Sequence, residues 1–337
     1  LYQNYYAWSN APKYIKIKLM LINIILLAIG LFALVKASDV FVDSASSFAI
    51  SMRAPKTLIA LTIAAFGTCA PELAISFNSI AAHNYDMTLA NVIGSCIVNI
   101  LLIVGIATIV NPIKVKNKII KNELPLLVIT SLAFCVALND SLFGNYKNGL
   151  SRLEAGAFLF IFAAFLLYIV IAYIKNKPKP RGRPPKAKYS LFRSTIYIII
   201  TIFVIAIASD LTVDNAAALA EKIGISEKII SMTVIVIGTS LPELVMTAGA
   251  AKKGEFELAV GNIIGTNIFN ICIVLGLPIM LYGGFESENF NIVDSVAVLL
   301  AALTYYVCSR SGQKLIRAEG VLMVTIFLCY YVYVLAS

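Results

Sequence analysis

Long apolar segments follow one another along almost the whole chain, and they limit its possible folds more than any motif does. Most are roughly 17–25 residues long, the length that an α-helix needs to cross a bilayer. Apolar residues make up 60% of the 337 residues and charged residues 13%, whereas soluble domains have about 45–50% and about 25%. We therefore predict an all-α polytopic membrane protein with ten transmembrane helices, at about 17–37, 57–82, 88–111, 123–139, 153–174, 194–209, 229–251, 257–282, 292–308 and 318–336. The first and sixth spans are expected to extend to about Ala49 and Ala220.

The second half of the chain repeats the first at a constant shift of 171 residues. The matched segments are "ASDVFVDSASSFA" (37–49) with "ASDLTVDNAAALA" (208–220), "GTCAPEL" (67–73) with "GTSLPEL" (238–244), and "NVIGSCIVNI" (91–100) with "NIIGTNIFNI" (262–271). Each copy holds five spans. We expect an N-terminal extension (1–19), a first five-helix repeat (20–174, motif 62–105), a basic cytoplasmic linker (175–192) and a second five-helix repeat (193–337, motif 233–276).

The odd number of spans in each copy decides the topology. After five crossings the chain has changed sides, so the second copy enters the membrane upside down relative to the first. Inverted repeats of this kind are a recurring transporter architecture, with the binding site near the midplane. We therefore predict two inverted five-helix repeats whose matching motifs meet from opposite directions.

Positive charge lies mainly in alternate loops, and the chain has a net charge of +9. By the positive-inside rule the loops rich in Lys and Arg are cytoplasmic, which places both termini outside. The segment "KNKPKPRGRPPKAKYS" (175–190) is typical of an extended, solvated linker. Its "PRGRP" resembles a motif that reads the minor groove of DNA. In a ten-span protein we expect no nucleic-acid partner and interpret the segment as a topology-fixing loop near anionic lipid.

A proline and a glutamate stand in the middle of the second and the seventh spans. Pro71 and Pro242 cannot donate a backbone hydrogen bond. Glu72 and Glu243 are charges of a kind that costs about 2.5–3.5 kcal/mol at the bilayer centre on insertion scales. A helix that only spans a membrane needs neither residue type. Irregular backbone is tolerated at this depth only where it is buried in protein or lines a cavity, and its freed carbonyls are then available as ligands.

Hydroxyl and amide side chains accompany the two glutamates at a spacing of four, which places them on one helix face. The pairs are Thr68 with Glu72, Thr239 with Glu243, Ser95 with Asn99, and Thr266 with Asn270, and Ser240 adds a further hydroxyl. This all-oxygen set suits hard cations, since Ca²⁺ takes 6–8 oxygens at about 2.3–2.6 Å. Two carboxylates match one Ca²⁺ or two Na⁺, which indicates an exchanger site. A single Ser or Thr usually bonds its own backbone, but two glutamates in the same repeated pattern favour function.

The other ionisable and soft side chains give no second site. The six cysteines (69, 96, 135, 272, 308 and 329) lack the paired spacing of a zinc or redox site, and we interpret them as buried packing residues. The single histidine, His83, falls in a short loop, where a ligand role is not expected. Asp39, Asp43, Asp210 and Asp214 also repeat, near the ends of the first and sixth spans. Solvation or pairing with loop cations is their default role, and an ion vestibule is the alternative.

At these residues the chain resembles the Ca²⁺/cation antiporter superfamily, specifically its prokaryotic sodium/calcium exchangers. The resemblance covers about residues 25–336 and rests on GTxxPEL twice and on GSxxxN and GTNxxN. It implies a core made of the second, third, seventh and eighth helices, across which the long first and sixth helices slide during alternating access. Carried over by position, the ion ligands would be Thr68, Glu72, Ser95, Asn99, Thr239, Ser240, Glu243, Thr266 and Asn270, with backbone carbonyls near Ala65 and Val236.

A few positions depart from the family's pattern. Cys69 and Cys96 stand where the family often has serine and asparagine, so the first half offers fewer oxygens and one sodium site is in question. Asn270 stands where potassium-dependent relatives typically carry aspartate, which favours the potassium-independent branch. Leu73 and Leu244 follow the glutamates where the proton/calcium branch usually has histidine, which disfavours proton coupling.

The sequence thus predicts a secondary antiporter that exchanges Na⁺ for Ca²⁺ by alternating access, with these ions as substrates, no cofactor and no catalytic residues. An H⁺/Ca²⁺ or other cation/proton antiporter is the alternative among transporters, and a passive cation channel is the alternative from another class. An intramembrane enzyme could use two glutamates as acid and base, but the sequence shows no accompanying nucleophile and no ATP-binding motif. We expect a monomer in the plasma (inner) membrane of a prokaryote.

Overall fold

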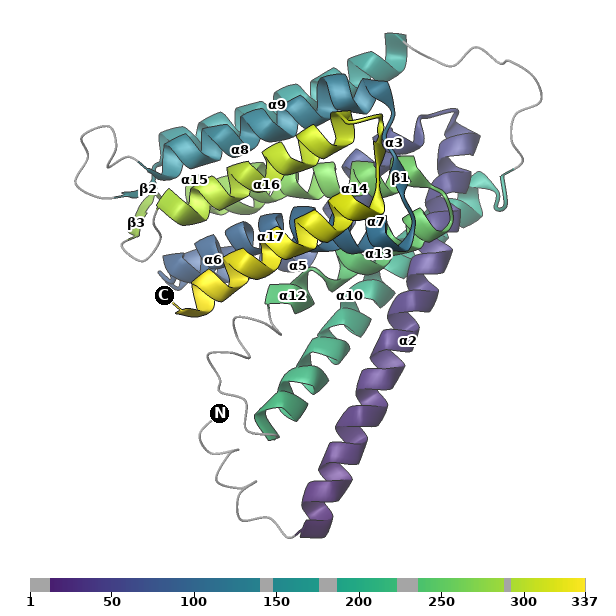
Figure 1. Ribbon diagram of the computed structural model, residues 1–337, viewed down its shortest axis with the longest axis vertical. Helices are drawn as coiled ribbons and strands as arrows, with labels where there is room; N and C mark the ends of the chain where they lie inside the picture. Colours follow the sequence, from purple (N-terminus) through teal and green to yellow (C-terminus); the bar gives the residue numbers. More distant parts are fainter. Residues whose placement is uncertain (1–12, 140–147, 176–186, 223–235, 288–291, 337) are drawn as a thin grey trace.

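The computed structural model describes residues 13–139, 148–175, 187–222, 236–287 and 292–336, and nearly all of them are helical (Figure 1). Segments labelled η are π-helical. The first half contains α2 (Lys13–Met52), α3 (Lys56–Ile59), η1 (Ala60–Ala64), α4 (Ala65–Thr68), α5 (Ala70–Ala81), α6 (Tyr85–Ile97), η2 (Val98–Ile103), α7 (Val104–Val110), β1 (Ile113–Lys114), η3 (Ile119–Glu123), α8 (Leu124–Leu138), β2 (Asn148–Leu150) and α9 (Arg152–Lys175). The second half contains α10 (Leu191–Lys222), α12 (Val236–Thr239), α13 (Leu241–Lys252), α14 (Phe256–Phe269), η6 (Asn270–Leu275), α15 (Gly276–Tyr282), β3 (Phe285–Ser287), α16 (Ile292–Arg310), β4 (Lys314–Leu315) and α17 (Arg317–Ala336).

Helices long and apolar enough to cross a membrane account for most of the described chain. Eight qualify singly, and Lys56–Thr68 with Ala70–Ala81, bent by 47°, makes nine if the pair is one span. The seventh expected span, 229–251, lies partly outside the described residues, and its described part is α12 and α13. Large apolar side chains face outward along the long helices, such as Phe32 on α2 and Phe203 on α10. Surfaces of this kind suit lipid, because soluble monomers rarely expose large apolar patches.

The long helices α2 and α10 pack along each other and run antiparallel (Figure 1). The hydroxyl of Ser47, near the end of α2, accepts a hydrogen bond from the Lys188 backbone N–H just before α10. Gly30, in the first half of α2, faces Thr212 in the last part of α10. Both helices continue beyond their apolar runs, as the sequence predicted. The first helices of the two copies therefore run in opposite directions. Part of the expected 1–19 extension, from Lys13 on, belongs to α2, and residues 1–12 lie outside the described residues.

Positions related by the 171-residue shift have matching backbone geometry. Helices α5 and α13 each begin after one residue that leaves the helical conformation, Cys69 (φ −82°, ψ 5°) and Ser240 (φ −90°, ψ 7°). After the other ends of these helices, His83 and Gly254 have φ values of 56° and 74°. His83 therefore occupies a left-handed turn position that favours glycine. Its Nδ1 lies 2.7 Å from the Tyr85 hydroxyl, in keeping with a role in the loop.

The two halves also exchange equivalent pieces. Strand β1 pairs with β4, and β3, the match of β1, pairs with β2, the match of β4. In the same way, Gly105 on α7 packs against Gly320 on α17, while its match Gly276 on α15 packs against Ala155 on α9. A Cβ atom at Gly105 would lie 3.0 Å from the Gly320 carbonyl oxygen, so this close approach requires glycine. Reciprocal exchange is the pattern that a two-fold relation between halves would produce.

The ion pairs between described residues gather where the loops expected on the cytoplasmic side meet. They join Lys56 with Glu255, Lys116 with Glu257, Lys188 with Asp43, and Lys253 with both Asp39 and Asp43. These pairs connect α2, the start of the second span, the loop before α8, the end of the linker and the turn between α13 and α14. They therefore fasten segments from both halves at one end of the molecule. The linker's "PRGRP" lies outside the described residues.

The repeated aspartates have different surroundings in the two halves. Asp43 lies 2.8 Å from the Lys253 ammonium, and Asp39 lies 3.4 Å from it. Both follow the default expectation for acids at helix ends. Their matches Asp210 and Asp214 form no ion pair with another residue in the described ranges.

Candidate ion-binding site

Two helix breaks meet at the centre of the described chain. Pro71 and Pro242 lie in the first turn of α5 and α13, directly after the breaks at Cys69 and Ser240. Because proline has no N–H, the carbonyl four residues earlier loses its helical partner. On α12 this carbonyl, that of Gly238, accepts a hydrogen bond from a hydroxyl of α10 at 3.1 Å instead. The sequence predicted these breaks, and their non-helical backbone is buried inside the protein.

Glu72 and Glu243 follow the two prolines and are both fully buried. Each lies in the first turn of its helix, where the helix dipole favours a negative charge. Neither oxygen of Glu72, and only one oxygen of Glu243, has a hydrogen-bond partner among the described residues. Since buried, unpaired charges are costly, the arrangement favours a bound cation between them.

Two further helices bring amide and hydroxyl side chains to the same region. Ser95 lies on α6, Thr266 on α14, and Asn99 and Asn270 lie at the beginning of η2 and η6, and all four are fully buried. The Ser95 hydroxyl and both amide groups have no hydrogen-bond partner among the described residues. Helix α6 packs on α5 and η6, and α14 packs on α4 and α13. π-Helical turns are frequent at functional sites, and here two of them begin at the site.

The hydroxyl groups next to the two breaks differ in whether they form hydrogen bonds. Thr68 donates to the carbonyls of its own helix, including that of Ala65 at 3.3 Å, which also accepts from the Cys69 N–H at 3.1 Å. This is the local bonding usual for a threonine in a helix. Ser240 is buried, and its hydroxyl has no partner among the described residues. Thr239 is half-buried beside it.

Cys69 connects the two halves at the site. Its thiol donates to Oε1 of Glu243 at 3.7 Å and lies 3.8 Å from the Thr266 carbonyl oxygen. The side chain is fully buried. The sequence indicated only a packing cysteine that lacks an oxygen, whereas the structure places its sulfur in contact with one of the two central carboxylates.

The predicted side chains therefore belong to four helical segments, those of the second, third, seventh and eighth expected spans, and these segments pack on one another. Val236 opens α12, and nothing of its side chain lies within the described part. Among the described residues, no three His, Cys, Asp or Glu side chains form a ready-made metal group. Hydroxyl, amide and backbone oxygens must therefore complete the shell of any cation, which suits hard ions with flexible geometry.

Two asparagines that the sequence analysis did not single out support the glutamate helices. Asn91 on α6 donates to the Glu72 carbonyl oxygen at 3.0 Å and to the Ser76 hydroxyl at 3.3 Å. Its match Asn262 on α14 donates to the Thr247 hydroxyl at 3.3 Å. The signal was available, because both asparagines stand at the same place in the repeated motif. Their hydrogen bonds join α6 to α5 in the first half and α14 to α13 in the second.

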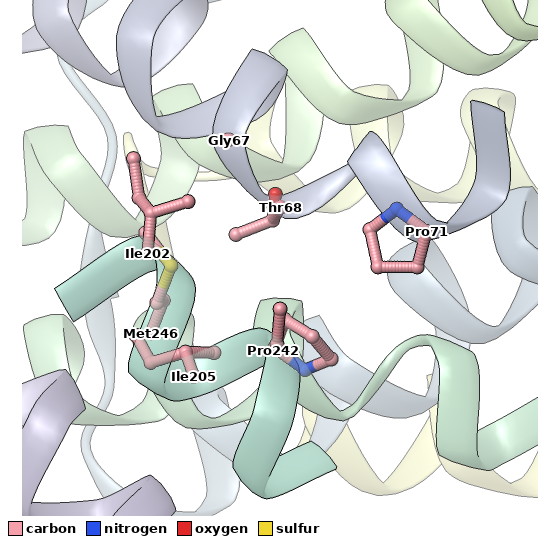
Figure 2. A pocket seen from close by; sticks show the side chains of 8 residues that line it. Gly67, Thr68, Pro71, Ile202, Ile205, Pro242 and Met246 are labelled. Carbon is pink, nitrogen blue, oxygen red and sulfur yellow. The ribbon is translucent and has the colours of Figure 1, made fainter. Parts of the chain in front are cut away.

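A narrow crevice, too tight to hold a water molecule, lies between the two breaks and α10. Figure 2 shows Pro71 and Pro242 on two of its walls, with Ile202 and Ile205 of α10 beside them. Three α10 residues line the crevice, Ile202, Ile205 and Ala206, and all three are apolar. Helix α10 thus covers the polar breaks with side chains that offer a cation no ligand.

Comparison with known proteins gives a consistent match. The model of the family described as sodium/calcium exchanger protein matches residues 22–171 and 193–336. The putative antiporter CaxA of Alkalimonas amylolytica is 33% identical over 322 residues, which cover 92% of this chain and 98% of CaxA. The inner membrane protein YrbG of Escherichia coli K12 is 33% identical over 318 residues, which cover 90% of this chain and 94% of YrbG.

A solved structure matches the fold as well as the sequence. The sodium-calcium exchanger NCX_Mj, soaked with 10 mM Na⁺ and zero Ca²⁺, superimposes with a TM-score of 0.77 and is 28% identical. The match covers 92% of this chain and 98% of NCX_Mj. The likeness thus extends over nearly the whole chain.

Proposed function

We propose that this chain, which belongs to the sodium/calcium exchanger protein family, moves Na⁺ into the cytoplasm in exchange for Ca²⁺. Family membership and the likeness to NCX_Mj already identify a cation/Ca²⁺ antiporter in a membrane. The choice of Na⁺ as coupling ion is the proposed step. The cation site rests on two buried carboxylates, Glu72 and Glu243, of which three oxygens lack a partner among the described residues. Leu73 and Leu244 follow them where proton-coupled relatives usually have histidine, which supports Na⁺.

The ion ligands in this proposal are the residues around the two breaks. Glu72 and Glu243 are shared, so that one Ca²⁺ or two Na⁺ neutralise them in competition. The remaining oxygens come from Thr68, Ser95, Asn99, Thr239, Ser240, Thr266 and Asn270 and from the carbonyls of Ala65 and Val236. Support comes from the burial of Ser95, Asn99 and Asn270 without a protein partner. When no cation is bound, the two buried carboxylates stay charged, and the occluded state is then costly to form. The transporter therefore changes sides only with an ion bound, which couples the flux of one ion to that of the other.

We also propose ten spans in two inverted five-helix repeats, 20–174 and 193–337, joined by the cytoplasmic linker 175–192. Three features support this arrangement: the antiparallel course of α2 and α10, the exchange of strands between β1–β4 and β3–β2, and the matching glycine contacts at Gly105 and Gly276. Alternating access then follows when α2 and α10 move over a core that presents the same breaks from both sides.

The chain is proposed to lie in the inner membrane of a prokaryote with both termini outside, as a monomer. The likeness to the inner membrane protein YrbG supports the membrane. The positive charge of alternate loops supports the orientation, and the ion pairs of Lys56, Lys116, Lys188 and Lys253 lie in the loops that this orientation makes cytoplasmic.

Uptake of ⁴⁵Ca²⁺ into proteoliposomes tests the coupling ion. Vesicles preloaded with Na⁺ are compared with vesicles preloaded with K⁺ and with vesicles held across a pH gradient. The proposal predicts uptake that requires internal Na⁺. Uptake that follows the pH gradient would make the chain a proton/calcium antiporter, and uptake without any counter-ion would make it a channel.

A further inference from the structure

We propose that the ion site also accepts a thiophilic divalent cation, with the sulfur of Cys69 as a ligand beside the Glu243 carboxylate. The inference rests on the proposed function to the extent that the two glutamates form the ion site. It adds a class of substrate, the cadmium-like ions that combine the charge of Ca²⁺ with a preference for sulfur. Cd²⁺ is the representative ion, since its size is close to that of Ca²⁺.

The position of the thiol supports this inference. Cys69 is fully buried and points across the interface between the halves, 3.7 Å from Oε1 of Glu243. The other Glu243 oxygen, both oxygens of Glu72 and the Ser95 hydroxyl have no partner among the described residues. The sulfur therefore contacts a buried carboxylate that keeps one oxygen without a partner among the described residues, which is more than a single buried cysteine offers.

The matched position in the other half shows what the sulfur replaces. Ser240 occupies the same break, at the same backbone angles, and presents a buried hydroxyl without a partner among the described residues. An oxygen there suits Na⁺ and Ca²⁺, whereas a thiolate selects softer metals. The site is thus hard in one half and carries one soft ligand in the other.

Binding in this mode replaces the S–H bond of Cys69 by a sulfur–metal bond, and the thiol proton leaves to bulk water. No oxidant or reductant takes part, and the ion remains divalent. The hydrogen bond from the thiol to Glu243 is lost, and both groups then contact the metal. A divalent ion with one thiolate and two carboxylates has a net charge of −1, so this shell is neutral, as it is with Ca²⁺, when one of the carboxylates takes up a proton.

The other thiols near the site define the controls. Cys96, next to Ser95, lies near Glu72 and Cys272, but it makes no hydrogen bond to a carboxylate among the described residues. Cys329 is exposed on α17, away from the site. Cys96→Ser therefore removes a neighbouring thiol, and Cys329→Ser removes a distant one.

The test is ¹¹³Cd²⁺ NMR on the purified full chain, together with displacement of ⁴⁵Ca²⁺ by Cd²⁺. We expect a resonance in the region of mixed sulfur and oxygen ligands for the unmodified chain, for C96S and for C329S. In C69S the resonance should move to the all-oxygen region. The advantage of Cd²⁺ over Ca²⁺ should fall by at least about tenfold, because a hydroxyl replaces the sulfur.

Ser240→Cys supplies a second readout that does not depend on C69S folding. A thiol at the matched break should add a second sulfur and move the resonance further toward sulfur ligation. An all-oxygen resonance in the unmodified chain, a shift in C96S rather than C69S, or equal Cd²⁺ preference in C69S and the unmodified chain would each overturn the inference. Because NMR needs no transport, failure of Na⁺-dependent Ca²⁺ uptake would leave this test intact.

Discussion

The two halves of the chain present the same glutamate after the same kind of helix break, yet they surround it differently. In the second half, Ser240 offers a hydroxyl without a partner among the described residues. In the first half, the Cys69 thiol already contacts Glu243 of the other half. The backbone of the site is therefore close to symmetric, whereas its ligand chemistry is not. Symmetry of the fold sets where a cation can be held, and the side chains decide which cation is preferred.

A second difference concerns the two long helices that cover this core. Residues of α10 lie against both breaks, Ile202 against Gly67 and Val213 against Gly238. Residues of α2 instead contact α13 after its break, where the Ser38 hydroxyl donates to the Val245 carbonyl. A nearly symmetric core thus carries an asymmetric cover. Such a cover has two equivalent but opposite positions, which is what alternating access requires.

The largest expected effect on transport comes from replacing either glutamate, because both halves contribute one carboxylate to the proposed site. Glu72→Gln and Glu243→Gln should each lower Na⁺-dependent ⁴⁵Ca²⁺ uptake by roughly a hundredfold or more, because removing one charge from a buried charged cluster costs about 3–5 kcal/mol. Glu154→Gln, at an exposed helix start, is the matched control and should transport normally. Robust exchange in either variant would mean that the halves do not share one ion.

The supporting asparagines should separate the halves. Asn91 donates to the Glu72 carbonyl as well as to Ser76, whereas Asn262 donates, among the described residues, to the Thr247 hydroxyl alone. Asn91→Ala should therefore raise the Ca²⁺ concentration for half-maximal uptake by roughly tenfold, since a buried unsatisfied group costs about 1–3 kcal/mol. Asn262→Ala should have a smaller effect.

Uptake titrations on both variants check this difference, and Asn117→Ala, at an exposed helix start before η3, serves as control. Equal losses in the two asparagine variants would show that the bond to the Glu72 carbonyl does not matter.

The break residues should set the preference for Na⁺. Cys69→Ser gives the first half an oxygen, so we expect the Na⁺ concentration for half-maximal exchange to fall by about threefold, as a harder ligand favours a hard ion. Ser240→Cys should raise it by a similar factor. Na⁺ titrations of Ca²⁺ release from proteoliposomes measure both. Shifts in the same direction, or none, would show that neither side chain faces the sodium sites.

The smallest expected effect comes from the one-sided ion pairs. Asp43→Asn removes the contacts with Lys188 and Lys253 and should change the exchange rate about twofold at low salt, since partly exposed pairs contribute about 0.2–1 kcal/mol. The effect should vanish at high ionic strength because salt screens such pairs. Asp214→Asn, its match, should have no salt-dependent effect. Exchange rates measured across a salt series decide the point, and a salt-dependent change in D214N would contradict it.

Much of this fold follows from the sequence because each part has a local cause. Apolar runs of bilayer length predict the spans, and Pro71 and Pro242 predict the breaks at Cys69 and Ser240. The π-helical segments η2 and η6 do not follow, since their apolar pattern is that of an α-helix. The strand pairs could not be predicted either, because strands of two or three residues are too short to show an alternating pattern of apolar and polar residues. The different contacts that α2 and α10 make with the core could not be predicted, because they depend on packing between segments that are distant in the sequence.

The site was predictable to a similar degree. Glutamates within apolar spans, in a motif that occurs twice, predict a cation site. The spacing of four places the threonine hydroxyls on the same helix face as the glutamates. The contact between Cys69 and Glu243 could not be predicted, because it joins residues from opposite halves and depends on how the breaks meet. The support from Asn91 was hidden in the same way, although its repetition at Asn262 was a visible signal.

The account's central claim is that one divalent ion lies between the glutamates of the two halves. Anomalous diffraction from crystals of the chain soaked with Ca²⁺ or Sr²⁺ tests it most directly. The account predicts a single strong peak within about 2.3–2.6 Å of carboxylate oxygens of both Glu72 and Glu243. A peak bound to only one of them, or separate peaks in the two halves, would contradict it.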